Sequence, residues 1–267
     1  MGFRDDRCVA VTEPLNETQV IANLGQTTDP SAQYYAAWWL GKMRSRHPKA
    51  IPLLLQTLKA LEQQPVDPER RGVALNAIRA LGKLKSPMAL TPLCELLNST
   101  DYSVREEAAR SLGKLQDPAA VEGIRRLLQS GISDAGGEQS SSALLREPCE
   151  ALIEALGDIG LSSAETLDTI LPFVQHPRPL IRAAACRALL QLTGESSWGI
   201  QLTEMLNHPE ALVRRGALLD LGATGWTSAG PAISAAAVEP SLKLVALRGL
   251  AEQSEDPEVL KAMDALI

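Results

Sequence analysis

The segment SVREEAARSLGKLQDPAAVEGIRRLLQSG, Ser103–Gly131, is the clearest copy of a unit that recurs along the chain. Its first part spaces apolar residues at helical intervals with charged residues between them, which predicts an amphipathic helix. These apolar residues are Val104, Ala108, Ala109, Leu112 and Leu115. Asp117 offers an N-cap carboxylate and Pro118 suits a first helical turn, so a second helix is expected to follow. The segment is therefore predicted to form a pair of helices.

The dipeptide Leu112-Gly113 sets a register that can be followed through the sequence. The positions equivalent to Gly113 are Gly41, Gly82, Gly157, Leu190, Gly222 and Ala251. Successive intervals run from 29 to 44 residues, the length of two helices with their turns. A lone helix pair cannot bury both of its faces, so neighbouring pairs must stack. We expect an all-α fold, a HEAT-like α-α superhelix of about six to seven helix pairs.

Parts of the chain depart from this pattern. Residues 1–14 have no periodicity and are expected to form an N-terminal arm. Residues 15–267 are expected to form a single repeat solenoid without an internal boundary. Within it, 130–142 is rich in glycine and serine and is predicted to be a flexible loop. The apolar side of the last helix is expected to stay uncovered unless a partner or a further chain packs on it, since the terminal repeats of a solenoid usually need a polar cap.

Composition limits the possible functions. The 267 residues carry a formal net charge of −6, which disfavours a nucleic-acid surface because binding phosphates requires clustered cations. The N-terminal residues lack an apolar signal core, and no run approaches a membrane span. We therefore expect a cytoplasmic protein with no nucleic-acid partner and no membrane insertion. The four cysteines show no metal-ligand spacing, so we expect reduced core thiols and no metal site: Cys8, Cys94, Cys149 and Cys186.

Four of the nine aromatic residues lie in one predicted helix that begins at Asp29-Pro30. The register assigns Ala36, Ala37 and Leu40 of this helix to the core. The aromatic residues then fall on the side that the reference unit gives to solvent: Tyr34, Tyr35, Trp38 and Trp39. They could cap the first repeat or receive the N-terminal arm. Equally, they could form a platform for a flat conjugated ligand or for a partner protein.

An acidic stripe follows the segment 130–142. Glu147, Glu150, Glu154 and Asp158 stand at positions i, i+3, i+7 and i+11 of one predicted helix. Such a stripe is by default a solvated helix face. The alternative is that one of its carboxyl groups acts as a general acid. No catalytic triad, phosphate loop or dinucleotide motif can be proposed, so the catalytic residues stay unknown.

Two further patterns have structural interpretations. All three histidines precede a proline and are expected to be turn residues, since the residue before proline is pushed out of the helical region: His47, His176 and His208. Three arginines share one register position and are expected to donate charge-assisted hydrogen bonds that set repeat stacking: Arg105, Arg182 and Arg214.

Several of these stretches resemble a known family. They are YYAAWWLGKMR at Tyr34–Arg44, RALGKL at Arg79–Leu84, and CRALLQLTGE with RRGALLDLGATGW within Cys186–Trp226. Together they are similar to the E-type subunit of the heterodimeric phycobilin lyases, the HEAT-like PBS lyase proteins. The similarity extends from about Asp29 to Trp226, and the aromatic run is its most specific part.

The resemblance implies an enzyme, a bilin lyase subunit active with a second, related HEAT-like subunit in a heterodimer. Such an enzyme binds an open-chain tetrapyrrole and joins it through a thioether to a cysteine of a phycobiliprotein. Phycocyanobilin on the phycocyanin α subunit is the commonest pairing. The bilin is a substrate, and no cofactor is implied. A thiolate adds across an activated pigment double bond, so the lyase must orient both reactants and steer a proton.

The same resemblance suggests roles for individual residues. Tyr34, Tyr35, Trp38 and Trp39 are assigned to the bilin or to the interface that encloses it. Three arginines on the polar side of neighbouring helices are candidates to pair with the pigment propionates: Arg71, Arg79 and Arg110. Glu150 or Glu154 is a weaker candidate for the proton donor.

Other functions stay open at this point. The chain could be a non-catalytic HEAT adapter that grips a protein, a related pigment-handling protein, or a lyase for phycoerythrobilin. The sequence does not decide which bilin and which acceptor cysteine are used.

Overall fold

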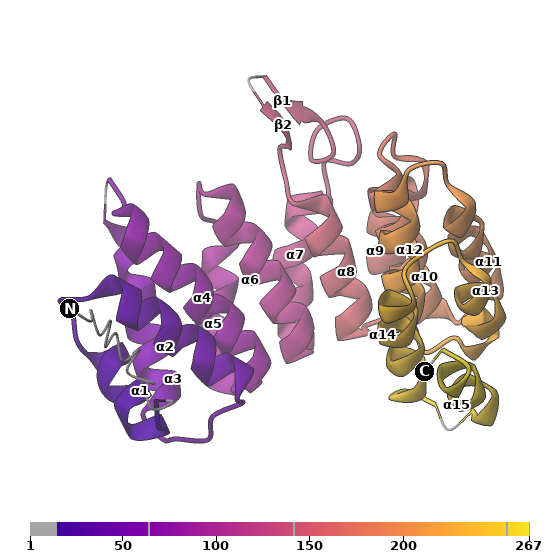
Figure 1. Cartoon of the computed structure of the whole chain (residues 1–267). Coiled ribbons are helices and arrows are strands. Elements are labelled where there is room, and N and C mark those ends of the chain that lie inside the picture. The colour runs from indigo at the N-terminus through magenta and orange to yellow at the C-terminus, as the bar shows by residue number, and fades with distance from the viewer. Residues whose placement is uncertain (1–14, 64, 141, 255, 267) are drawn as a thin grey trace, which may run out of the picture. The chain divides into compact units, whose positions relative to one another are not determined.

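Helices joined by short turns make up most of the chain (Figure 1). The computed structural model describes residues 15–63, 65–140, 142–254 and 256–266. The N-terminal arm expected at 1–14 lies outside these residues. The chain divides into two compact units, Met1–Ala80 and Leu81–Ile267. The expectation of one uninterrupted solenoid over 15–267 stays a prediction.

The first unit holds the first three helices and most of the fourth. Its elements are α1 (Glu17–Gly25), α2 (Pro30–Lys42), α3 (Ala50–Thr57), the 3₁₀ helix η1 (Leu58–Glu62) and α4 (Pro68–Leu84), whose last turn belongs to the second unit. Asn16 and Gln19 form a capping box at the start of α1. The Asp29 carboxylate accepts the N–H of Ala32 and Pro30 occupies the first turn, so α2 begins as predicted.

The second unit continues the helix pairs. Its elements are η2 (Pro87–Ala89), α5 (Leu90–Leu96), α6 (Tyr102–Leu115), η3 (Pro118–Ala120), α7 (Val121–Leu128), β1 (Glu138–Gln139), β2 (Ser142–Leu145), α8 (Cys149–Ile159), α9 (Ala164–Ile170), η4 (Leu171–Gln175), α10 (Pro179–Thr193), α11 (Ser196–Glu204), η5 (Met205–Asn207), α12 (Ala211–Ala223), η6 (Thr227–Ala229), α13 (Gly230–Ala235), α14 (Pro240–Ala251) and α15 (Pro257–Asp264). The reference segment Ser103–Gly131 contains α6, η3 and α7. The predicted helix pair is confirmed.

The helices of the second unit form two layers. The even-numbered helices α6, α8, α10, α12 and α14 pack side by side in one layer, called here the even-numbered layer (Figure 1). Each odd-numbered helix from α5 to α13 packs on one of them. Small aliphatic side chains such as Ala108, Leu112 and Leu152 are fully buried between the helices. The all-α class expected from the repeats is therefore confirmed.

The glycine of the Leu-Gly register lets consecutive helices approach closely. A Cβ added at Gly82 would lie 2.7 Å from the Cα of Ser111 on α6. Within the first unit, a Cβ at Gly41 would lie 2.8 Å from the Cα of Ala80. Because the opposing atoms belong to the backbone, no change of rotamer would relieve the contact. The register that reveals the repeats is thus also a packing requirement.

The recurring arginines fix the turns between repeats. Each donates from Nη1 to a carbonyl six residues earlier, over 2.8–2.9 Å: Arg105 to Ser99, Arg182 to His176, and Arg214 to His208. Arg105 and Arg214 also donate to carbonyls of the following turn, those of Arg146 and Ala237. The expected hydrogen bonds between repeats are confirmed for these two arginines.

The three histidines are turn residues, as predicted. In each, Nδ1 accepts the backbone N–H two residues further on, over 3.0–3.2 Å: Lys49 for His47, Arg178 for His176, and Glu210 for His208. This arrangement uses the imidazole to close a turn.

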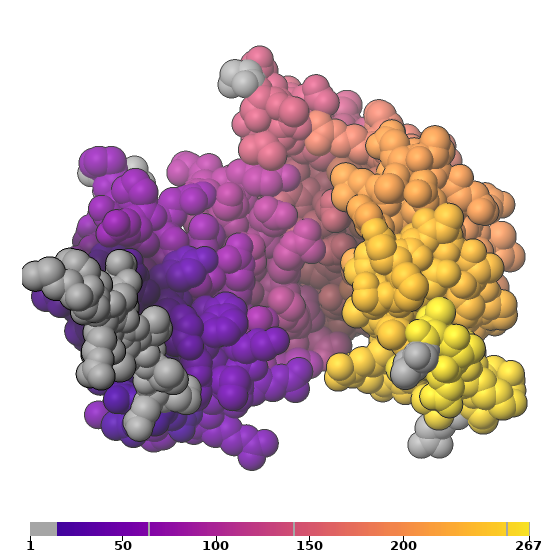
Figure 2. Space-filling view, viewed as in Figure 1, coloured from indigo at the N-terminus to yellow at the C-terminus, as the bar shows by residue number. Residues whose placement is uncertain are grey.

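The segment 130–142 contains secondary structure that the sequence analysis did not predict. Residues of β1 pair antiparallel with β2, and this hairpin projects from the surface between α7 and α8 (Figures 1 and 2). The side chains of Ala135 and Leu145 are 1% and 3% exposed, so they anchor the segment by burial. The hairpin was not predicted, and the flexibility of the segment stays a prediction.

The apolar side of the last helix, α15, is mostly buried. Val259 of α15 is 2% exposed, and Ala262, Met263 and Leu266 pack against the core between α12, α13 and α14. Leu260 is the exception, at 53% exposure. The prediction of an uncovered apolar side was therefore largely wrong. Among the described residues, no helix has the length and apolar character needed to cross a bilayer.

Candidate functional site

The aromatic residues of α2 point away from the core. Tyr34, Tyr35 and Trp38 are 48%, 43% and 44% exposed, and Trp39 is half-buried. On the opposite side Ala36, Ala37 and Leu40 are fully buried, as the register predicts. The helix thus presents a broad aromatic surface to solvent at a real cost, since exposed rings forgo burial of large apolar areas. Such a surface is typical of a binding site.

The aromatic surface is ordered by contacts of its own. The rings of Tyr35 and Trp38 lie 5.5 Å apart, centroid to centroid, at an angle of 38°. The Tyr34 ring lies against Gly72 of α4, where an added Cβ would be 3.6 Å from its Cδ2. The amide of Asn76 donates to the Tyr34 carbonyl over 3.2 Å. These contacts fix the orientation of the aromatic helix relative to α4.

Two of the three predicted propionate partners lie on the same helix, α4. Arg79 donates from Nη1 to Oδ1 of Asn76 over 3.2 Å, and Asn76 in turn holds α2. Arg71 stands two turns earlier on α4 and is half-buried. The sequence analysis missed Asn76, which is 4% exposed and connects the cationic side chain of Arg79 to the aromatic helix.

Arg110, the third predicted propionate partner, is engaged by carboxylates of its own unit. It lies 2.5 Å from Glu154, 3.5 Å from Glu106 and 3.8 Å from Glu150. Burial acts to lower the pKa of Arg110, but Glu154, Glu150 and Glu106 outweigh it and raise that pKa. A propionate would have to displace these partners of Arg110.

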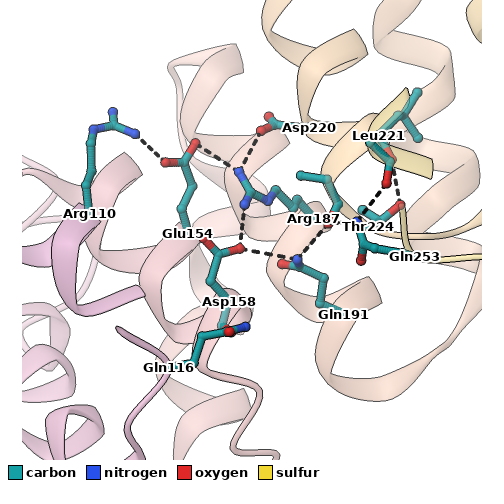
Figure 3. Close-up of polar contacts among 12 residues, drawn as sticks. Arg110, Gln116, Glu154, Asp158, Arg187, Gln191, Asp220, Leu221, Thr224 and Gln253 are labelled. Carbon is teal, nitrogen blue, oxygen red and sulfur yellow. Dashed lines mark hydrogen bonds and ion pairs between the residues drawn. The ribbon is translucent and has the colours of Figure 1, made fainter. Parts of the chain in front are cut away.

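The acidic stripe is not a solvated face of a single helix, because Glu147 lies before α8, which begins only at Cys149. Arg105 pairs with Glu147 over 2.9 Å, and Arg187 of α10 lies 3.5 Å from Glu154 and 2.5 Å from Asp158 (Figure 3). The default interpretation of the stripe was therefore wrong. Its carboxylates lie between the arginines of the two neighbouring helices, α6 and α10.

Arg187 is the centre of this network and was not identified from the sequence. Its side chain is 12% exposed, and its third partner is Asp220 of α12, at 3.3 Å (Figure 3). Burial acts to lower the pKa of Arg187, and the carboxylates of Asp158, Asp220 and Glu154 more than reverse that effect. Burial raises the pKa of Asp220 to about 7, with Glu154 and Glu150 acting in the same direction and Arg187 against them.

The two predicted proton donors have different surroundings. Glu154 lies between two guanidinium groups, at 2.5 Å from Arg110 and 3.5 Å from Arg187. Glu150 lies further from Arg110, at 3.8 Å, and its side chain is 41% exposed. Burial and the neighbouring Glu154 raise the pKa of Glu150, with Arg110 opposing them. A carboxyl group with a raised pKa is the better proton donor, so the geometry favours Glu150 over Glu154.

Cys149 and Cys186 are packed as core thiols, as expected, whereas Cys94 is only half-buried. Burial raises the pKa of Cys149 to about 12 and that of Cys186 to about 11. Both stay protonated near neutral pH, and a protonated thiol is a weak nucleophile. In the described ranges, no group of three histidine, cysteine, aspartate or glutamate side chains could hold a metal ion; Cys8 lies outside them.

The sequence and the structure were compared with known proteins. Residues 58–135 and 146–222 match the HEAT-repeat family, and residues 32–60 match the PBS lyase HEAT-like repeat. Bilin biosynthesis protein RpcE of Synechococcus sp. (strain WH8020) is 61% identical over 95% of this chain and 96% of its own length. The phycocyanobilin lyase subunit alpha of Picosynechococcus is 43% identical over 93% of this chain and 95% of its own.

A solved structure agrees with these relatives. The complex of CpcE and CpcF of phycocyanin lyase from Nostoc contains a chain that is 36% identical, with a TM-score of 0.84 and full coverage of both chains. The stacked helix pairs define a HEAT-repeat protein, and the HEAT-like superhelix expected from the sequence is confirmed. Within that class, the chain belongs to the phycocyanobilin lyase alpha-subunit family.

Proposed function

We propose that this chain is one subunit of a bilin lyase that binds an open-chain tetrapyrrole and attaches it to a cysteine of a phycobiliprotein through a thioether. Phycocyanobilin and the phycocyanin α subunit are the first substrates to test. The observation that carries the proposal is the exposed aromatic surface of α2, in a chain of this family. Flat conjugated rings stack well on Tyr and Trp side chains.

The proposal assigns the residues as follows. Tyr34, Tyr35, Trp38 and Trp39 contact the pigment or the interface that encloses it. Arg71 and Arg79, on the helix next to the aromatic surface, pair with the propionates, for which a guanidinium is well suited. Arg110 serves mainly to hold the carboxylates of α8. Glu150 is the preferred proton donor.

The proposal also includes partners. A second HEAT-like subunit completes a heterodimer, which is supported by the likeness to a chain of the Nostoc complex of CpcE and CpcF. The phycobiliprotein is the acceptor, the bilin is a substrate, and no cofactor takes part. We place the protein in the cytoplasm, with neither nucleic acid nor membrane as a partner.

Coexpression tests this function directly. The chain, a second subunit, phycocyanobilin and an apo-phycobiliprotein are produced together, and zinc fluorescence of the denatured acceptor reports covalent pigment. We expect pigment on the acceptor only when both subunits are present. No covalent pigment above the control with the second subunit alone would leave the non-catalytic adapter. Phycoerythrobilin in place of phycocyanobilin tests the alternative pigment.

A further inference from the structure

A small pocket opens beside Glu150 in the second unit. It has a volume of about 190 Å³ and lies where the even-numbered helices α6, α8, α10 and α12 begin. Its walls include Tyr102, Leu145, Cys149, Glu150, Leu180 and Leu212. Glu150 already has an assigned role as proton donor, whereas the pocket itself has none. It combines apolar walls with two carboxyl groups, those of Glu150 and Glu210, the guanidinium of Arg178 and the phenol of Tyr102.

The hairpin supplies one wall of the pocket and is fixed in place. Leu145 at the end of β2 is 3% exposed. Arg178, at the start of α10, donates to the Ala143 carbonyl over 2.5 Å and to Glu138 over 2.7 Å. The Nε2 of His176 donates to the Gly136 carbonyl over 3.0 Å, because its Nδ1 already accepts the N–H of Arg178. The hairpin is therefore a fixed part of the pocket wall.

The size and chemistry of the pocket indicate its occupant. A cavity of roughly 150 Å³ lined by apolar side chains accepts a benzene ring, so this pocket accepts one substituted five-membered ring but not a four-ring pigment. Leu212 at the rim is 64% exposed and would be covered by such a ring. A pyrrole ring is flat and apolar on its faces and carries polar atoms at its edge. The Glu150 carboxyl and the Tyr102 hydroxyl can serve that edge.

The titration of the two polar groups agrees with this use. Burial raises the pKa of Tyr102 to about 12, so the phenol stays a hydrogen-bond donor. Burial also raises the pKa of Glu150, with Glu154 and Glu106 acting in the same direction and Arg110 and Arg187 against them. Covering the carboxyl with an apolar ring would raise that pKa further. Because both pKa values are raised, Tyr102 and Glu150 each keep a proton when the pocket is filled.

We propose that this pocket receives the pyrrole ring that carries the reacting double bond of the bilin, and that Glu150 delivers the proton to it. The inference rests on the proposed function. The acceptor thiol first loses its proton to solvent, and its sulfur forms a bond to the exocyclic carbon. The π electrons of the broken double bond then take the proton of the Glu150 carboxyl. Water returns a proton to the Glu150 carboxylate, so thiol and alkene become one thioether.

The pocket is tested by filling its rim. Leu212→Trp narrows the opening at an exposed position, so it should leave the melting temperature unchanged. With the second subunit present, we expect it to weaken phycocyanobilin binding at least about tenfold in an absorbance titration. Ile200→Trp is the matched control, because Ile200 lies on α11 outside the pocket and is 55% exposed. It should bind the pigment like the unchanged protein.

The proton donor is tested separately. Glu150→Gln keeps the shape of the side chain but cannot donate that proton, so pigment binding should persist while the attachment rate falls about a hundredfold and loses its acidic pH limb. Glu122→Gln is the control, since Glu122 lies on α7 outside the pocket and its side chain is 81% exposed. That variant should keep the rate.

The outcomes separate the two proposals. If the unchanged heterodimer neither binds nor attaches pigment, the proposed function is wrong. If it attaches pigment and Leu212→Trp binds pigment equally well, the pocket is not the ring site. If Glu150→Gln keeps the full rate and pH profile, Glu150 is not the donor.

Discussion

The charged guanidinium of Arg187 lies in a site with little water and is surrounded by carboxylates from two helices. Removing water from an ion is costly, and here Glu154, Asp158 and Asp220 compensate. The carboxylates depend on the guanidinium as much as it depends on them. A change at this one residue therefore affects three acidic groups at once.

Replacing Arg187 by methionine should lower the free energy of unfolding by about 3–5 kcal/mol, because it leaves buried carboxylates without a partner. Urea denaturation followed by circular dichroism measures this loss. Arg248→Met is the matched control. Arg248 pairs with Glu252 one turn away at 73% exposure, so its loss should cost no more than about 0.5 kcal/mol. Equal losses for the two variants would contradict the buried network.

Asp220 should make stability depend on pH. An aspartate in an unfolded chain titrates near about 3.9. In the fold, burial first, and then Glu154 and Glu150, raise the Asp220 pKa to about 7. Between these values the folded state binds more protons than the unfolded state, so the contribution of Asp220 to the unfolding free energy falls as pH rises from about 4 to about 7.

Asp220→Asn removes this titration. The unfolding free energy of the variant minus that of the unchanged protein should therefore increase from about pH 4 to about pH 7 and level off above it. Urea unfolding at a series of pH values measures the difference. A difference that stays constant with pH would show that Asp220 does not titrate in this range.

The network could have been found from the register. Arg110, Glu154 and Arg187 each stand three residues before the register position, at Gly113, Gly157 and Leu190. Charges of alternating sign at one register position predict ion pairs between successive helices. Asp220 could not have been found in this way, because it stands two residues before Gly222 and not three. Its side chain still extends to Arg187 and pairs with it.

At the scale of single elements, α2 was predictable in detail. Its N-cap, its core residues and its aromatic side all follow from Asp29 and the 3.6-residue period. The hairpin was not, because Gly- and Ser-rich sequence carries no periodicity. Its order depends on Arg178 and His176, which lie about forty residues further along the chain. Long-range contacts of that kind leave no local signal.

The aromatic surface of α2 gives a test that separates binding from folding. Trp38→Leu with Trp39→Leu should strongly reduce pigment transfer while leaving the helical content nearly intact, because the core side of α2 is unchanged. Transfer is read by zinc fluorescence and folding by circular dichroism. Ile200→Ala, also an exposed position, should change neither. Loss of folding in the tryptophan variant would instead support a structural role for the rings.

The close approach of α4 and α6 gives another element-scale prediction. Gly82→Ala forces a Cβ against the Ser111 backbone at 2.7 Å, so we expect a loss of about 1–3 kcal/mol in the free energy of unfolding. Gly230→Ala is the control, since an added Cβ there meets nothing within 4 Å. It should be neutral or slightly stabilising. Thermal and urea unfolding measure both, and a neutral Gly82→Ala would refute the packing role of the register.

At the largest scale, polar contacts within the second unit link the even-numbered layer from helix to helix. Gln116 donates to the Asp158 carbonyl, and Gln191 donates to the Ala223 carbonyl, over 3.0 Å each. The Ala223 carbonyl also accepts from Gln253, which follows α14. With the arginine–carboxylate network, these bonds connect α6 through α14. In a repeat protein, such links between neighbours are what make unfolding cooperative.

Hydrogen exchange should reveal this connection. Arg187→Met is expected to speed amide exchange throughout α8, α10 and α12, because opening one of these helices removes partners from the next. The helices of the first unit, α1 to α3, should exchange as before. Mass spectrometry of peptic peptides resolves the two regions. Faster exchange confined to α10 would contradict coupling across the layer.

The position of Arg187 limits how this array can change in evolution. Repeat proteins commonly lengthen or shorten by gaining or losing a whole helix pair. Here one guanidinium is shared by acids from the helices on both sides, so an extra pair inserted before or after α10 would separate it from one group of partners. We expect natural variation in repeat number to be tolerated near the ends of the chain and excluded at its centre.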